Sequence, residues 1–139
     1  MTNQALERRP RVTSVGVAVG HETLEHGRVE ALLNSNGWLS VTKSFEGKSD
    51  SFETAVGDET VDEVMRRADD LSRVRFDEDR GYTPVPDEAR YRIDLVFVDE
   101  DEMLIEVWQN ELESKDEAWR LVRLLGEQVR EVSDGRAIL

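Results

Sequence analysis

The sequence contains no cysteine, and this absence excludes several kinds of site at once. Disulfide bonds, thiolate metal ligands and cysteine nucleophiles cannot form without it. Long apolar runs are missing too, since no stretch approaches the roughly eighteen apolar residues of a membrane span. The first residues also lack the apolar core of a signal peptide. We therefore expect a cytoplasmic protein without a membrane-spanning segment.

Positive charge is scarce, and lysine is the scarcest basic residue. The chain has 31 acidic and 18 basic residues, a formal net charge of −13, and only three lysines, Lys43, Lys48 and Lys115. A surface this negative repels nucleic-acid phosphates and anionic lipid, so neither is an expected partner. It attracts a protein with a basic surface. The acidity also fits the salt or the genome of the source organism, and both explanations stay open.

A length of 139 residues fits one domain with its own core. Residues 1–10 are polar and aperiodic, which predicts a flexible N-terminal tail, followed by a single domain over residues 11–133. Residues 134–139 form a C-terminal tail that either docks or stays free. Alternating apolar residues predict strands at 11–19, 28–33, 39–45 and 52–56. The Asn36-Gly37 pair predicts a tight turn between the second and third strands.

The apolar period changes to that of a helix in two places. Residues 60–63 and 114–117 both have the capping-box form, in which a Ser or Thr and a Glu satisfy free amides of the first turn. An apolar stripe follows each box, to Leu71 in the first case and to Ser133 in the second. The sequence therefore predicts two amphipathic helices that begin at these boxes.

Residues 90–109 carry the clearest pattern, two apolar alternating runs separated by an acidic turn. This is typical of a β-hairpin with apolar side chains on both faces. Together the elements predict the α+β class, with a single antiparallel sheet and the two amphipathic helices packed on one of its faces. The other apolar face of the hairpin then needs a cover, which is either the first hairpin or another chain.

His21 and His26 are the only histidines and the main candidates for metal ligands. On a helix their spacing of five would place the rings about 140° apart, so they cannot form the shared face of a helical zinc site. A loop could still bring both to one metal, although two surface histidines are the simpler interpretation. No serine elbow, phosphate loop or dinucleotide fingerprint occurs. We accordingly expect no enzyme activity and no cofactor.

Four features are matched by a known family. They are a glycine-containing turn before an aromatic at 35–40, a helix at 61–71, the hairpin strand at 91–97 with its acidic turn, and a final helix. In these features the chain resembles emfourin-type small bacterial inhibitors of M4 metalloproteases over residues 28–125. The resemblance implies a proteinaceous inhibitor and assigns no inhibitory residue. The N-terminal extension and the long final helix depart from the family pattern.

We interpret the sequence as a non-catalytic, acidic, protein-binding domain, either an inhibitor or an immunity-type neutraliser. Its expected binding residues are Trp38, Leu39, Val96, Val98, Met103 and Ile105. One alternative is a small-ligand or metal-binding domain, or an enzyme, that uses the loop from His21 to His26. Another is a homodimeric structural domain in which the second hairpin face is the dimer interface.

Overall fold

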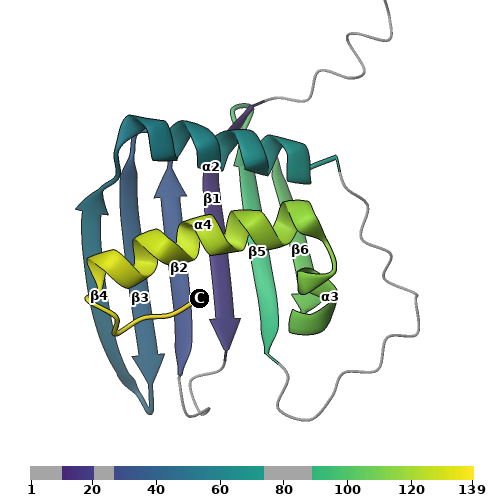
Figure 1. Cartoon of the computed structure of the whole chain (residues 1–139). Coiled ribbons are helices and arrows are strands. Elements are labelled where there is room, and N and C mark those ends of the chain that lie inside the picture. Colours follow the sequence, from purple (N-terminus) through teal and green to yellow (C-terminus); the bar gives the residue numbers. More distant parts are fainter. Residues whose placement is uncertain (1–10, 21–26, 74–88) are drawn as a thin grey trace, which may run out of the picture.

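The protein is described from a computed structural model, which covers residues 11–20, 27–73 and 89–139. The predicted N-terminal tail lies outside these residues. Figure 1 shows the strands side by side with the long helices in front of them. In chain order the elements are β1 (Val12–Gly20), β2 (Arg28–Asn34), β3 (Trp38–Phe45), β4 (Lys48–Ala55), α2 (Asp58–Leu71), β5 (Arg90–Phe97), β6 (Glu102–Trp108), α3 (Gln109–Glu113) and α4 (Asp116–Val132).

All six strands form one antiparallel sheet in the order β4-β3-β2-β1-β5-β6. The predicted turn joins β2 to β3: Gly37 has a φ of 95°, and the side chain of Asn36 accepts a hydrogen bond from the Trp38 amide at 3.0 Å. A positive φ suits glycine because it has no Cβ. The first hairpin therefore extends the sheet, and it does not fold over the second hairpin.

Both long helices lie on the same side of the sheet (Figure 1). The apolar stripe of α2 is buried at Val61, Val64, Ala68 and Leu71, and that of α4 at Ala118, Leu121, Val122, Leu125 and Val129. Alternate residues of β2 and β5 are buried beneath them, together with Val15 and Val17 of β1, Leu39 and Val41 of β3, and Ile105 and Val107 of β6. Each large aliphatic side chain buried in this way contributes about 1.5–3 kcal/mol. The predicted α+β class with a single antiparallel sheet is confirmed, and Figure 1 draws both long helices in front of that sheet.

The two predicted capping boxes are wrong. Helix α2 begins after Gly57 with no side-chain cap, and Glu63 instead accepts hydrogen bonds from Arg66 and Arg67 one turn later. Helix α4 begins after Lys115, while the Ser114 hydroxyl donates to the Glu111 carbonyl at 2.7 Å. The Glu63 carboxylate is therefore used by ion pairs within α2. The Ser114 hydroxyl is used by the preceding helix α3, which the sequence pattern did not predict.

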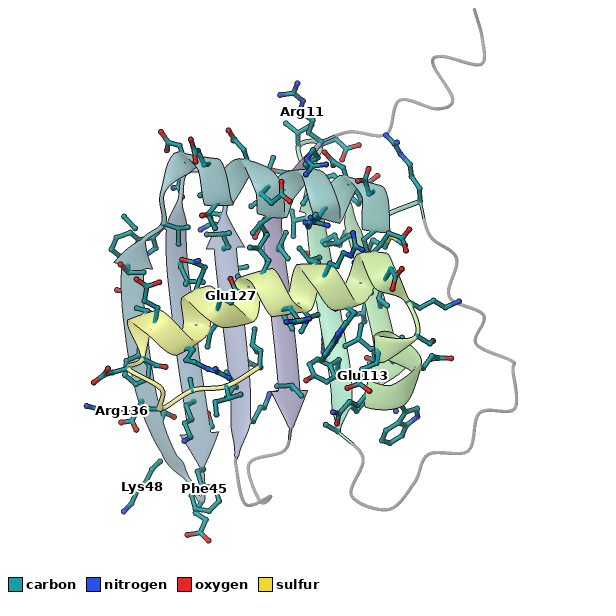
Figure 2. The ribbon with its side chains drawn as sticks, in the orientation of Figure 1. Arg11, Phe45, Lys48, Glu113, Glu127 and Arg136 are labelled. Atoms are coloured by element: carbon teal, nitrogen blue, oxygen red, sulfur yellow. The ribbon has the colours of Figure 1, made fainter. Side chains whose placement is uncertain are left out.

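The C-terminal tail docks onto the domain. Asp134 and Gly135 have positive φ values of 55° and 81°, which turn the chain back after α4. Ala137 is then fully buried, and Lys43 donates to the Arg136 carbonyl at 2.7 Å. Figure 2 shows Arg136 near β4, where its guanidinium lies 6.0 Å from the ring of Phe52. Residues 134–139 thus close the core at the β4 end of the helices.

Candidate functional site

The face of the sheet that points away from α2 and α4 is the candidate site, and we call it the open face. No described residue outside the sheet covers it. Strand pairing sets its side chains in rows, because residues paired across neighbouring antiparallel strands point to the same side. Its central side chains are Gly16, Ala18, Glu30, Leu32, Ser40, Thr42, Arg92, Asp94, Leu104 and Glu106.

A shallow depression of about 440 Å³ lies at the centre of the open face. Its floor is β1, where Gly16 and Ala18 present almost no side chain, and its walls include Leu32, Arg92 and Asp94. A Cβ added at Gly16 would lie 3.6 Å from the Cβ of Asp94, an ordinary contact distance. The depression is therefore a consequence of small residues on the central strand.

Three large exposed apolar side chains share the open face with this depression, and one of them, Leu32, lines it. Leu32, Trp38 and Leu104 are 44%, 43% and 49% exposed, and all three point to the open face from β2, β3 and β6. Scattered single exposures are ordinary on a protein surface, whereas several around one concave region are typical of a contact surface.

The charges of the open face are partly paired. Arg28 contacts Glu30 at 2.6 Å, and Arg90 contacts Glu106 at 2.8 Å while its guanidinium lies 5.4 Å from the ring of Trp108. Asp94 differs, because its buried Oδ1 has no hydrogen-bond partner among the described residues. A buried acceptor without a donor costs free energy, about 1–3 kcal/mol and more for a charged group. A bound molecule with a donor would remove that cost.

The predicted binding residues separate into two groups. Trp38 and Val98 are exposed, and Val96 is partly exposed on the open face. Placing Leu39 and Ile105 on an exposed surface was wrong, since they are 0% and 5% exposed. Met103 is also directed to the core and is partly buried there.

Strand register explains the correction. Ile105 pairs with Ile93, and Met103 with Leu95, so both residues of β6 share the helix-covered face with their buried partners on β5. The sequence shows that β6 has two faces, but only the pairing shows which one lies beneath the helices.

Four residues of the open face were missed: Gly16, Leu32, Asp94 and Leu104. Each alternates with buried or partly buried neighbours in its strand. That alternation was the available signal, and Leu32 and Leu104 are the apolar residues that occur out of phase with it.

His21 and His26, the candidate metal ligands of the alternative interpretation, lie outside the described residues. Within residues 11–20, 27–73 and 89–139, no group of three or more His, Asp or Glu is arranged to hold a metal ion. None of the helices in that part of the chain is both long and apolar enough to cross a membrane.

A smaller cavity of about 210 Å³ lies on the helical side of the protein. Arg67, Arg120 and Arg123 line it together with Glu63 and Glu127, the last of which is labelled on α4 in Figure 2. Glu63 is paired with Arg67 at 2.7 Å. The pKa of Glu63 is lowered, and the main cause is the hydrogen bond from Arg66. Exposed arginines and acids of this kind form a solvated, charge-paired helix surface.

No protein-family model matches the chain, and a search of curated proteins also finds no match. The functional inference therefore rests on the geometry of the open face.

Proposed function

We propose that this chain is a non-catalytic protein-binding domain of the cytoplasm and that the open face is its binding surface. The observation that carries the proposal is the depression over Gly16 and Ala18: exposed Leu32 lines it, and its wall holds an Asp94 carboxylate oxygen with no hydrogen-bond partner among the described residues. Concave apolar surfaces with a few unsatisfied polar groups are favourable places for binding.

Three features support a protein as the ligand. The depression is shallow and lies within a broad sheet surface, as suits a flat protein contact. Its lining contains the hydroxyls of Ser40 and Thr42, and the described residues of the lining include no histidine that would activate them as nucleophiles. The net charge of −13 favours association with a partner that has basic residues around the contact.

Within this class we propose an inhibitor or an immunity-type neutraliser, because such proteins act by covering a surface of their target. The resemblance to emfourin-type inhibitors makes M4 metalloproteases the first targets to test. The assay adds the purified chain to a protease of this class and follows hydrolysis of a peptide substrate. Under this proposal, inhibition rises with the concentration of the chain and saturates.

Variants of the open face test the binding surface itself. We expect Leu32→Glu and Trp38→Glu each to weaken partner binding by more than about tenfold, because a charge replaces an apolar contact. Ile138→Glu is the matched control, since Ile138 is 55% exposed but lies in the C-terminal tail on the helical side. Calorimetric titration with the identified target measures the affinity. Equal affinities for all three variants and the wild type would reject the open face as the binding surface.

A further inference from the structure

The open face has two neighbouring central rows that run across all six strands. From β4 to β6, the first row is Ser51, Thr42, Glu30, Ala18, Arg92 and Glu106, and the second is Glu53, Ser40, Leu32, Gly16, Asp94 and Leu104. On β5 the rows place a positive side chain, Arg92, two residues from a negative one, Asp94. Such a pair is complementary to a second copy of itself in the reverse direction.

Among the residues that the structure describes, neither member of this pair has a neutralising partner. The described residues supply no hydrogen-bond donor to Asp94 Oδ1 and no ion pair to Arg92, although Arg28 and Arg90 on the same face both have acidic partners. The guanidinium group of another molecule would satisfy the carboxylate, and the carboxylate of that molecule would satisfy Arg92.

A two-fold axis in the plane of the contact, perpendicular to β5 and between the two rows, brings these groups together. It places the first row of one copy on the second row of the other, so each Arg92 faces an Asp94. The same operation places Ala18 on Gly16, Glu30 on Leu32, Glu106 on Leu104 and Glu53 on Ser51. These rows then contain no contact between like charges. The small residues of β1 meet at the centre, where they allow two sheets to approach to about 10 Å.

The open face is also large enough for a stable contact. Six strands about 4.8 Å apart, each about seven residues long at about 3.3 Å per residue, cover on the order of 650 Å² before side-chain relief is added. Stable interfaces of standard size bury about 600–1,000 Å² on each partner, a range that includes this area. The acidic surface elsewhere opposes association, and salt weakens that repulsion.

From these observations we infer that a second copy of the chain covers the open face when no other partner is bound. The dimer is isologous, and two reciprocal ion pairs between Arg92 and Asp94 fix its register. Its role as a regulator rests on the proposed function: a target that uses the same face must displace the second copy, so target binding and self-association compete.

Charge exchange tests the register directly. We expect the wild-type chain to have twice the mass of one chain in sedimentation equilibrium, with tighter association at high salt. Arg92→Asp and Asp94→Arg should each weaken association at least about tenfold, because each change creates two contacts between like charges. The double variant Arg92→Asp/Asp94→Arg restores both ion pairs and should restore the dimer.

Arg120→Asp on the exposed side of α4 is the control and leaves the mass unchanged. Circular dichroism verifies the fold of every variant.

Two results would overturn this inference. One is a monomer at every protein and salt concentration, and the other is a dimer that both single reversals leave intact. The proposed function fails differently, by target binding that is unaffected by Leu32→Glu and Trp38→Glu. A monomer that loses target binding in those variants keeps the proposed function and rejects the dimer. If the charge exchange restores the dimer but Leu32→Glu and Trp38→Glu leave target binding unchanged, the dimer is kept and the open face is rejected as the target-binding surface.

Discussion

Tyr91 shows how one residue couples the core to pH. Its side chain is 5% exposed in the core under the helices. Burial raises the pKa of its phenol, because the charged form loses hydration, and the negative charge of Glu113 raises it further. Glu113, labelled in Figure 2, is the last residue of α3. The short helix that the sequence pattern did not predict therefore affects the ionisation of a core residue.

This pKa shift predicts a loss of stability at alkaline pH. The folded protein retains the Tyr91 proton to a higher pH than the unfolded chain does. The contribution of the neutral phenol to the free energy of unfolding is therefore complete below a pH of about 10 and is lost as the pH rises further. We expect Tyr91→Phe to reduce the fall in the free energy of unfolding between pH of about 9 and about 11. Urea unfolding across this range measures the effect. Identical pH dependence in the wild type and the variant would contradict it.

The C-terminal tail is the element whose position depends most clearly on one side chain. The Ser133 hydroxyl donates to the Val129 carbonyl at 2.7 Å and accepts a hydrogen bond from the Ala137 amide at 2.9 Å. Ser133 is 1% exposed and Ala137 is 0% exposed, so water cannot replace these bonds. One hydroxyl thus joins the end of α4 to the tail.

Ser133→Ala should therefore destabilise the protein by about 1–3 kcal/mol, because it leaves a buried amide without an acceptor. Ser114→Ala is the matched control. Its hydroxyl makes a similar bond to the Glu111 carbonyl, but at an exposed position where water can substitute, so we expect a change below about 0.5 kcal/mol. Chemical denaturation of both variants gives the comparison. A loss of equal size at the two positions would show that the tail does not depend on Ser133.

At the scale of the whole molecule, acidic residues outnumber basic ones on both sides of the sheet. Helix α2 has six acidic residues and two arginines, and the central rows of the open face place Arg92 among three glutamates and Asp94. The net charge of −13 thus opposes folding through repulsion, to which α2 contributes.

Salt should stabilise this protein. Screening weakens repulsion between exposed acids, so we expect the free energy of unfolding to rise by on the order of 1 kcal/mol between low salt and about 1 M sodium chloride. Arg92→Asp, which we expect to be monomeric, is the suitable background for the measurement. In that background Asp62→Asn/Asp70→Asn removes two charges from α2 and should reduce the response to salt. Stability that falls with added salt would show that attractive ion pairs dominate.

Most of the fold was predictable from periodicity. Alternation gave the positions of the strands, and the 3.6-residue stripes gave α2 and α4, because burial of one face dominates the energetics of such elements. Helix starts were less predictable, because Glu63 and Ser114 have local partners that compete with the capping role. The candidate site was only partly predictable: Trp38, Val96 and Val98 are accessible, whereas Leu39 and Ile105 belong to the core.

The sequence by itself determined which residues of each strand share a side, since side chains alternate along any extended chain. Only the tertiary structure decided which side the helices cover, because that choice depends on pairing between strands far apart in the sequence. The pairing of β1 with both β2 and β5 brings Gly16 between Leu32 and Asp94, residues that lie far apart in the sequence. The open face exists because long-range register placed these side chains together on the side that the helices do not cover.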